Sequence, residues 1–395
     1  MKSINLLYLG YWSAHDSITH STIFQHLEVL SGFDKVNKVI FCSIERHGEI
    51  QPVAIPIPKV SHRPLHSKNL PGKFITKWLD FFIFPRQLKS LIKKHNIHLT
   101  IGAGTQAGTL VLKAAKNTPA KVLVSFFDPH AQYMRALGIW KKYDPRYLYL
   151  NYWEKKLKKQ ADWLFPVSHA YRQTLLKEGI PDEKLFTVPC TVNLEKFKPD
   201  KEKGLAVRQK LDFSAEDTVG IYVGKFGDIY FDEEAFDWLA AVNKIIPQLK
   251  LIILTSQEKP RITAGLQRAG LAKNDYFIAC VAHQEVPDYL NAADFAFSFI
   301  KPHPYSHAYS PIKHGEYWAC GLSIVLPDHI GDDSAIIKKS GAGVVVKNLT
   351  KPETDLRKLP AVLQNKKPIF IRNLARQNRK PKLVGDIYTN ILSGT

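Results

Sequence analysis

The sequence predicts an α/β protein of two domains, each a parallel sheet covered by helices on both faces. Three observations support this prediction. Short apolar runs alternate with helical stretches along most of the chain, as in strands joined by helical crossovers. The chain has 395 residues, more than one hydrophobic core usually organises. No G-x-G-x-x-G fingerprint follows a predicted strand, which argues against a dinucleotide-binding dehydrogenase.

The first domain is predicted to span residues 1–197. Its strands are expected at 4–9, 36–43, 98–101, 121–127, 163–167 and 185–188. Its helices are expected at 18–30, 78–95, 105–116, 146–161 and 170–178. Residues 45–72 are rich in proline and histidine, which predicts a long loop.

A second alternating series predicts a second domain over residues 218–368, after a charged linker at 197–217. Its strands are expected at 219–223, 249–254, 276–280, 295–299, 323–326 and 343–346. Its helices are expected at 233–246, 262–269, 286–292, 310–320 and 334–339. The tail, residues 369–395, is predicted to be mostly helical with a break at Pro381.

Composition indicates a globular protein with anionic partners. Apolar residues make up 45% of the chain, and 55 Lys plus Arg against 36 Asp plus Glu give a net charge of +19. Such an excess favours nucleic acid, an anionic membrane surface or phosphorylated substrates. No RNA-binding aromatic motif or zinc-finger spacing occurs, so nucleic acid is not expected as a partner.

The stretch 143–163 interleaves lysines with Tyr147, Tyr149, Tyr152 and Trp153. Two interpretations stay open: a face that rests on anionic lipid headgroups, or a solvated helix with ordinary core aromatics. No run approaches 18 apolar residues, and the first residues resemble a strand rather than a signal peptide. The four cysteines form no C-x-x-C pair. We therefore expect a cytoplasmic protein, with peripheral association at the inner membrane face as an extension.

The segment 309–325 says most about function. Ser310 is expected to cap a helix whose first residue is Pro311, and Gly321 is expected to end it. The free N–H groups at a helix N-terminus favour phosphate. Lys313 would lie near that end, and a carboxylate almost two turns further, Glu316, could meet a sugar hydroxyl. The segment therefore predicts a nucleotide-sugar site.

The pattern Ser-Pro-x-Lys-x-x-Glu-Tyr-x-Ala-Cys-Gly-x-x-Ile-Val resembles the donor-binding helix of retaining, metal-independent GT-B glycosyltransferases of family 4, or group 1. The resemblance implies two Rossmann-like domains facing each other across a cleft. The first would serve the acceptor and the second the nucleotide sugar, with the C-terminal helix packing back on the first. It implies that the helix N-terminus and a basic residue hold the diphosphate and that Glu316 binds ribose. The family's second glutamate, eight residues earlier, is Ala308 here.

Two further segments match the family's donor site. Gly224 and Lys225 follow a predicted strand where the family usually has Gly-Arg, a base that contacts the diphosphate. The family's next lysine, about five residues on, is replaced by Tyr230, and Lys313 is expected to compensate. The alternative for Lys225 is a surface lysine.

The run 281–294 resembles the family's base-binding turn followed by a helix. The resemblance implies that backbone groups near Val281 read the nucleobase with His283 nearby. The alternative for His283 is a histidine that merely flanks a helix. His303 and His307 lack a third ligand, so a mobile donor-site loop is expected there rather than zinc.

Two candidates for chemistry follow a buried strand, where parallel sheets place their ligands. Related enzymes often have a His-Asp pair here, near the donor sugar, whereas this chain has Asp128-Pro129-His130. Asp128 and His130 both remain candidates, with Asp128 as an acceptor-hydroxyl contact or base; a loop histidine near the cleft is the alternative for His130. Gly10, in the turn after the first strand, is expected to lie on the acceptor side.

The expected function is therefore that of a retaining glycosyltransferase. It would move a sugar from a UDP or GDP donor to a hydroxyl of a glycan or lipid-linked acceptor in surface polysaccharide or lipopolysaccharide assembly. No cofactor and no metal are expected, because fixed positive groups and helix dipoles can neutralise the departing diphosphate. Two alternatives stay open: a GT-B nucleotide-sugar epimerase, and a non-catalytic GT-B-like protein that binds a glycan or a partner.

Overall fold

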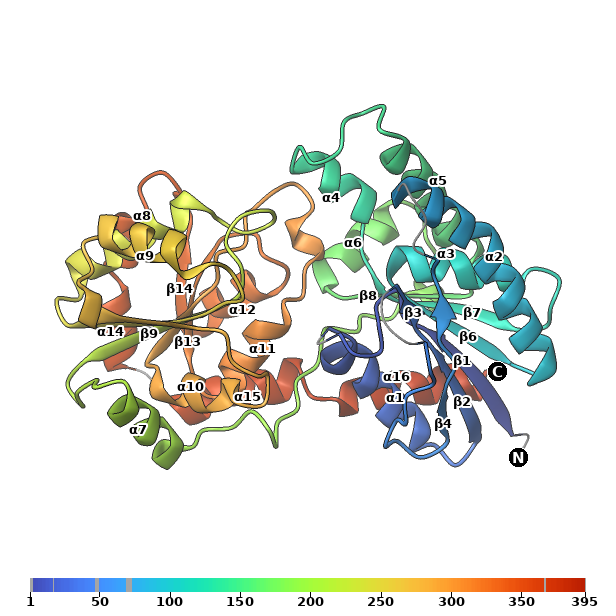
Figure 1. Ribbon diagram of the computed structural model, residues 1–395, viewed down its shortest axis with the longest axis horizontal. Helices are drawn as coiled ribbons and strands as arrows, with labels where there is room; N and C mark the ends of the chain where they lie inside the picture. Colours follow the sequence, from blue (N-terminus) through green and yellow to red (C-terminus); the bar gives the residue numbers. More distant parts are fainter. Residues whose placement is uncertain (1–2, 17, 47–49, 69–72, 366, 395) are drawn as a thin grey trace. The chain divides into compact units, whose positions relative to one another are not determined.

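The structure is a computed structural model that describes residues 3–16, 18–46, 50–68, 73–365 and 367–394 (Figure 1). The chain divides into two compact units. Unit 1 comprises Met1–Thr191 together with Pro381–Thr395, and unit 2 comprises Val192–Lys380.

Unit 1 is built on a six-stranded sheet in which neighbouring strands are all parallel. Its order is β4-β2-β1-β6-β7-β8. The strands are β1 (Ile4–Leu9), β2 (Val36–Cys42), β4 (Val60–His62), β6 (Leu99–Ala103), β7 (Lys121–Phe127) and β8 (Trp163–Pro166). Numbered within the sheet, this is the doubly wound order 3-2-1-4-5-6. The strands are apolar and mostly buried, because helices cover both faces of such a sheet.

The helices of unit 1 follow the strands in alternation. They are a π-helical turn η1 (Thr19–Ile23), α1 (Phe24–Ser31), α2 (Lys73–Lys94), α3 (Gly104–Ala115), α4 (His130–Ala136), α5 (Pro145–Gln160), α6 (His169–Lys177) and a 3-10 turn η2 (Asp182–Lys184). α5 begins where a helix is expected to begin. The Asp144 side chain accepts the Arg146 N–H, and Pro145 occupies the first helical position.

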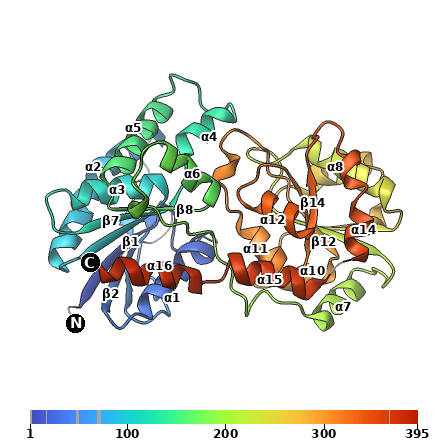
Figure 2. The same ribbon diagram turned by 180° about the vertical axis from the view of Figure 1, so that it is seen from behind.

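The C-terminal helix α16 (Lys382–Ser393) belongs to unit 1, far from the rest of that unit in sequence. It packs beside α1 (Figure 2). The Tyr388 hydroxyl lies 2.8 Å from His26 Nδ1, and Lys35 Nζ donates to the Leu392 carbonyl at 2.5 Å. Val384 and Tyr388 are fully buried in the core that β1 and β2 share.

Unit 2 repeats the same sheet, with order β11-β10-β9-β12-β13-β14 and parallel neighbours. The strands are β9 (Thr218–Val223), β10 (Leu249–Leu254), β11 (Tyr276–Ala279), β12 (Phe295–Phe297), β13 (Ser323–Pro327) and β14 (Gly343–Val346). Again the order is 3-2-1-4-5-6, so β9 and β12 flank the point where the winding reverses. The expected α/β class with two Rossmann-like domains is confirmed.

Helices and turns cover both faces of this second sheet. They are α7 (Lys201–Lys210), α8 (Glu233–Ile245), α9 (Lys259–Arg268), η3 (Lys273–Asp275), α10 (Val286–Ala292), η4 (Ser306–Ala308), α11 (Ile312–Ala319), α12 (Asp333–Ser340), α13 (Glu353–Leu356), α14 (Leu359–Gln364) and α15 (Pro368–Asn378). The expected break at Pro381 is confirmed, since α15 ends before it and α16 starts after it. Gly321, at φ +81°, follows the end of α11, as expected.

Three local predictions are wrong, and one helix was not predicted. The predicted loop 45–72 contains β4 and half of a small two-stranded sheet, β3 (Ile44–Glu45) with β5 (Leu65–His66). The predicted linker 197–217 contains α7. The predicted strand 185–188 makes an isolated bridge to β8, with two backbone hydrogen bonds to that edge. The helix that was not predicted is α4. Each error concerns a short or polar element that carries little periodic signal.

Candidate active site

The donor residues expected from the sequence gather at the carboxyl edge of the unit 2 sheet. Gly224 directly follows β9, and α11 follows the loop that leaves β12. β9 and β12 are neighbours at the point where the strand order reverses. Doubly wound sheets bind ligands outside the carboxyl ends of their strands at this point. The fold therefore places the donor candidates where a ligand is expected.

Lys313, in the first turn of α11, carries its ammonium group into the protein. Its Nζ is buried and has no hydrogen-bond partner among the described residues. It lies 4.3 Å from the centroid of the Tyr230 ring and 5.1 Å from that of Tyr222. Burial lowers the pKa of Lys313 to about 8, although Glu316 partly opposes this shift. A buried cation that has ring faces and no hydrogen-bonding group beside it among the described residues is poised to accept an anion.

Gly224 makes room for this ammonium group. Its φ of +149° is a backbone conformation that other residues rarely adopt. A Cβ added there would lie 2.6 Å from Lys313 Nζ. The glycine after β9 and the lysine of α11, 89 positions apart in the sequence, therefore form one site.

Lys225 behaves differently from Lys313. Its side chain is exposed, and its backbone carbonyl accepts the Tyr222 hydroxyl. Tyr230, which replaces the family's second lysine, lies over Lys313 instead of supplying a charge of its own. Lys313, which belongs to α11, thus places a positive charge beside the residues that follow β9.

The expected capping of the donor helix is wrong in detail. α11 starts at Ile312, Pro311 is its N-cap residue, and no side chain caps it. The Ser310 hydroxyl instead accepts a hydrogen bond from the Arg379 guanidinium. The N–H groups of the first turn are therefore not occupied by a Ser310 side chain, which suits an anion-binding end.

Arg379 belongs to a fully buried polar network behind the start of α11. Its Nη2 donates to both carboxylate oxygens of Asp333, at 2.5 and 2.7 Å. His314 Nδ1 lies 2.7 Å from the same carboxylate, and its Nε2 lies 2.6 Å from the Ser298 hydroxyl. Burial raises the pKa of Asp333, but the Arg379 charge and the His314 hydrogen bond lower it overall. The network ties the donor helix to α12 and to the end of α15.

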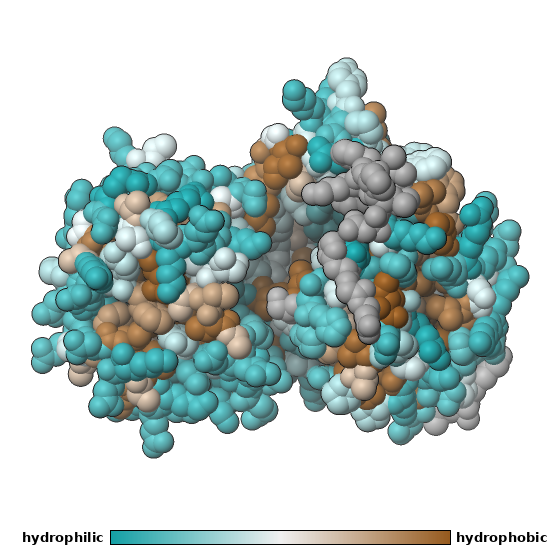
Figure 3. Space-filling view, viewed as in Figure 1, coloured by the Kyte–Doolittle hydropathy of each residue, from teal (hydrophilic) through white to brown (hydrophobic). Residues whose placement is uncertain are grey.

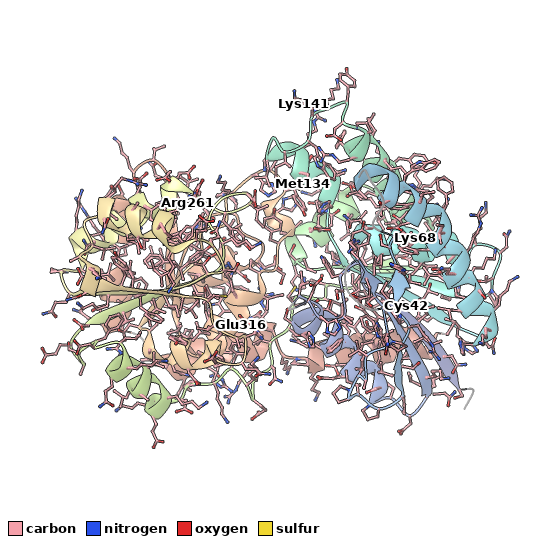
Figure 4. All side chains as sticks on the ribbon, in the orientation of Figure 1. Cys42, Lys68, Met134, Lys141, Arg261 and Glu316 are labelled. Atoms are coloured by element: carbon pink, nitrogen blue, oxygen red, sulfur yellow. The ribbon has the colours of Figure 1, made fainter. Side chains whose placement is uncertain are left out.

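Glu316 and His283, expected to meet ribose and base, contact each other. Glu316 lies on α11, where Figure 4 labels it, and is buried. His283 Nε2 lies 2.9 Å from Glu316 Oε1, and Lys196 Nζ lies 2.9 Å from His283 Nδ1. Because an ammonium can only donate, Nδ1 accepts and Nε2–H donates to the carboxylate. Lys196 therefore donates to His283, and His283 donates to Glu316.

Val281 and Ala308 complete the candidates of unit 2. Val281 lies just beyond β11 and is partly buried against the core of the unit. Ala308, at the position of the family's second glutamate, is buried in η4. In the same loop, His303 Nε2 lies 2.7 Å from the Tyr309 hydroxyl, and His307 Nδ1 lies 3.0 Å from the Pro304 carbonyl.

The candidates for chemistry lie in unit 1, also at the carboxyl edge of its sheet. Asp128 follows β7, and burial raises its pKa to about 7. His130 begins α4, and burial lowers its pKa to about 4, so its imidazole is neutral at physiological pH. The Tyr133 hydroxyl is hydrogen-bonded to His130 Nδ1, and the Trp140 ring packs edge-on against the imidazole.

Gly10 has a structural reason to be glycine. Its N–H donates to the Cys42 carbonyl at 2.8 Å, and an added Cβ would lie 2.6 Å from Ile23 Cδ1. The turn that follows it is held by Glu45, whose carboxylate accepts the Ala14 N–H at 2.8 Å and the Ser13 hydroxyl at 2.5 Å. Gly10 therefore fixes the approach of η1 to β1 and β2.

Sequence reasoning missed four side chains at these sites. Glu154 lies in a lysine-rich helix and resembles a surface residue, yet it is buried beside Asp128. Asp333 begins α12, and its carboxylate is buried, which its place at a helix start does not indicate. Arg379 and His314 gave no local signal, because their partners are remote in sequence. The one indication that the sequence offered was that Glu154 occupies a position in the α5 pattern where an apolar residue is expected.

Comparison with known proteins gives one matching family model and several similar folds. Residues 38–196 match the family model described as Glycosyltransferase Family 4. The fold resembles that of a sucrose-phosphate synthase from Thermosynechococcus elongatus, with a TM-score of 0.76, 15% identity, and coverage of 99% of this chain and 100% of that one. No curated protein matches the chain by sequence.

Two other solved structures are similar throughout their length. Anabaena HepE in complex with UDP has a TM-score of 0.69 at 13% identity, covering 100% of both chains. WaaG, a glycosyltransferase involved in lipopolysaccharide biosynthesis, has a TM-score of 0.65 at 13% identity, covering 97% of this chain and 99% of that one. The GT-B fold expected from the resemblance is thereby confirmed, and the match of residues 38–196 to the family model is consistent with a family 4-like glycosyltransferase.

Proposed function

We propose that the protein is a retaining glycosyltransferase that uses a nucleoside-diphosphate sugar without a metal ion. One observation carries the proposal: the buried, unpaired ammonium of Lys313 beside Gly224 at the start of α11. A buried cation without a counter-ion is costly, and a diphosphate would supply the missing charge. Positive groups and helix dipoles at a departing diphosphate stabilise the charge that develops there.

Each donor candidate has a place in this proposal. The diphosphate would meet Lys313, the N–H groups that follow Ser310 and Pro311, and the exposed Lys225. Glu316 would accept hydrogen bonds from ribose, with His283 donating to its carboxylate and Lys196 donating to His283. The nucleobase would lie against the backbone near Val281. The complexes of HepE with UDP and UDP-glucose support this class of donor.

The acceptor would be served from unit 1. Asp128 would accept a hydrogen bond from the acceptor hydroxyl, and neutral His130 would contact the transferred sugar. The acceptor class we propose is a glycan or lipid-linked sugar of surface polysaccharide or lipopolysaccharide synthesis. The WaaG likeness and the strongly basic composition support that class.

The same unit carries a face suited to an anionic membrane. Trp78 and Phe82 of α2 and Tyr152 of α5 are 62%, 44% and 52% exposed, and Phe81 of α2 packs edge-on against Tyr149 of α5 at 4.8 Å. Brown hydrophobic residues are visible on this unit among teal ones in Figure 3. Lysines at 155, 156 and 159 flank the aromatics. In the part of the chain that the structure describes, no helix is both long and apolar enough to cross a membrane.

Donor binding by titration calorimetry tests the proposal. UDP, GDP and a panel of their sugars are titrated in the presence of a chelator, with Lys313→Met and Lys244→Met as variants. Lys244 is an exposed lysine of α8 and controls for the loss of one charge. We expect Lys313→Met to weaken binding about 10- to 100-fold, the worth of a charge-assisted hydrogen bond, and Lys244→Met to have no effect.

Product analysis with the donor that binds then separates the alternatives. Transfer with retention of the anomeric configuration supports the proposal, whereas conversion of the donor to another sugar nucleotide without an acceptor indicates an epimerase. If no nucleotide binds wild type, the non-catalytic interpretation holds.

A vesicle sedimentation assay tests the membrane face. We expect Trp78→Ser with Tyr152→Ser to release the protein from vesicles that contain anionic phospholipid, and Phe370→Ser in unit 2 to leave it bound. Equal sedimentation of both variants would contradict the proposed face.

A further inference from the structure

A buried carboxyl group, that of Glu154, lies beneath the start of α4 and has no part in the function proposed above. Glu154 is 1% exposed and belongs to α5. Its Oε1 accepts the Ala131 N–H at 2.8 Å. Ala131 is the second residue of α4, so this bond satisfies an open N–H of the helix start that carries His130.

The second oxygen of the same carboxyl group, Oε2, differs from Oε1 in its surroundings. Glu154 Oε2 is buried without a hydrogen-bond partner among the described residues, and so is Gln132 Oε1. Gln132 interacts with the same carboxyl group, and Gln132 Nε2 donates to Asn151 Oδ1 at 3.0 Å. A buried carboxylate oxygen without a donor is costly, whereas a protonated one can donate to an acceptor such as Gln132 Oε1.

Of the charges around Glu154, that of Asp128 favours the protonated form and that of Lys158 opposes it. Asp128, at the end of β7, is a nearby like charge, and His130 on α4 is neutral. Lys158, one turn further along α5, is paired at 2.5 Å with Glu178, which follows α6. From α3, which packs against α5, the titratable group is Lys113, and its ammonium lies over the Trp153 ring, 5.6 Å from the centroid.

The two other charged or titratable groups on α4 have partners of their own. The Tyr133 hydroxyl is hydrogen-bonded to His130, and Arg135 donates to the Tyr147 hydroxyl at 3.3 Å. None of the contacts described for these groups is an ion pair with Glu154.

We propose that Glu154 is a positioning residue held as a neutral acid, whose hydroxyl donates to Gln132 Oε1 while its other oxygen holds the Ala131 N–H. It thereby fixes α4 and His130 next to Asp128 without adding a second negative charge there. Burial raises the pKa of Glu154 to about 8, reinforced by the Asp128 charge and opposed by the Ala131 hydrogen bond, Lys158 and Gln132. Because Asp128 and Glu154 interact, their protons are lost in steps that belong to the pair.

The pH dependence of stability tests this inference without any sugar. A carboxyl group whose pKa rises from 4.5 unfolded to about 8 folded binds more protons in the folded state between these values. Its contribution to stability is full below about pH 4.5 and is lost as the pH rises through about 8. Glu154→Gln keeps an oxygen for Ala131 and a donor for Gln132 but cannot titrate.

We therefore measure urea midpoints of wild type, Glu154→Gln and Glu183→Gln from about pH 5 to about pH 9. Glu183 is an exposed glutamate and serves as the matched control. The midpoint of wild type is expected to fall relative to that of Glu154→Gln across this range, while Glu183→Gln runs parallel to wild type. Parallel curves for wild type and Glu154→Gln would mean an ionised Glu154 with a reversed Gln132 amide, and would overturn the inference.

A second readout links the residue to transfer, and this step rests on the proposed function. With the donor identified and kept saturating at every pH, so that Lys313 does not contribute, the high-pH fall of kcat in wild type is expected to be absent in Glu154→Gln. An unchanged high-pH limb would overturn the positioning role. If no nucleotide sugar binds wild type, the proposed function fails, and the urea series still decides the protonation of Glu154.

Discussion

The sheets of the two units have the same strand order, but the groups at their carboxyl edges differ in charge. In unit 2 the carboxyl edge holds a buried, unpaired ammonium, that of Lys313, and the carboxylates near it are hydrogen-bonded. In unit 1 the corresponding edge holds two carboxyl groups, Asp128 and Glu154, and the neutral imidazole of His130. One edge suits an anionic leaving group, and the other suits a hydroxyl group. The chemistry is therefore set by the residues beyond the strands and not by the fold.

The strongest test of this contrast is Asp128→Asn. If unit 1 serves only the acceptor, sugar transfer should fall about 100-fold or more, the typical worth of a positioned acid or base, while donor affinity stays unchanged. Kinetic assays and calorimetry measure the two effects separately, and Asp34→Asn on the exposed surface is the control. An equal loss of donor affinity would contradict the proposal that donor and acceptor bind to different units.

The next largest effect should come from Arg379→Met. It leaves Asp333 buried without its guanidinium partner, at a cost of about 3–5 kcal/mol in the free energy of unfolding. Urea unfolding measures this loss. Arg376→Met, three residues earlier on the same helix and exposed, should cost little. Similar stability of the two variants would show that the network does not hold the donor helix.

The pH dependence of donor binding sharpens the contrast further. Because burial lowers the pKa of Lys313 to about 8, the free protein loses this charge above that pH. Donor affinity should therefore fall as the pH rises from about 8 to about 9.5, by up to about tenfold per pH unit. Calorimetry in buffers of different ionisation enthalpy should detect proton uptake near pH 8.5 on binding. Lys313→Met should show neither effect, and a flat affinity profile in wild type would contradict the role of Lys313.

The smallest effect expected is that of Gly224→Ala. The added Cβ would meet Lys313 Nζ and strain the backbone, which should cost about 1 kcal/mol in stability and weaken donor binding. Gly179→Ala also lies at positive φ, but its Cβ meets nothing within 4 Å, so it should cost stability alone. Equal donor affinity in both alanine variants would separate Gly224 from the site.

The sequence was sufficient for the parts of the fold that depend on local pattern. The strands Ile4–Leu9, Leu249–Leu254 and Gly343–Val346 have the predicted bounds, because each is a short apolar run with clear limits. β3 and β5 have two residues each, too few for any period to show. α4 follows a polar Asp-Pro-His segment, and its support, Glu154, comes from another helix.

In the candidate site, too, some features could be predicted from local sequence and others could not. Lys313 and Glu316 could be placed on one helix from their spacing alone, and the structure does place both on α11. The environment of each could not be derived, because it depends on residues remote in sequence. Ser310 has the residue type of a helix cap, yet Arg379, 69 positions away, determines what its hydroxyl does. The lowered pKa of Lys313 likewise comes from burial, and no local pattern connects Lys313 to Tyr222, Tyr230 and Gly224, the residues beside its ammonium group.

The return of the chain to unit 1 at Pro381 has a practical consequence. Unit 2 is an insertion within unit 1, and its first and last residues adjoin, since the Val192 N–H donates to the Arg379 carbonyl at 2.8 Å. Joining Thr191 to Pro381 through a short linker should therefore yield unit 1 as a self-contained protein, whereas a truncated chain that stops at Thr191 lacks α16. The excised unit 2 could be exchanged for the corresponding unit of a similar structure, and donor preference should follow unit 2 if the proposed division between the units is correct.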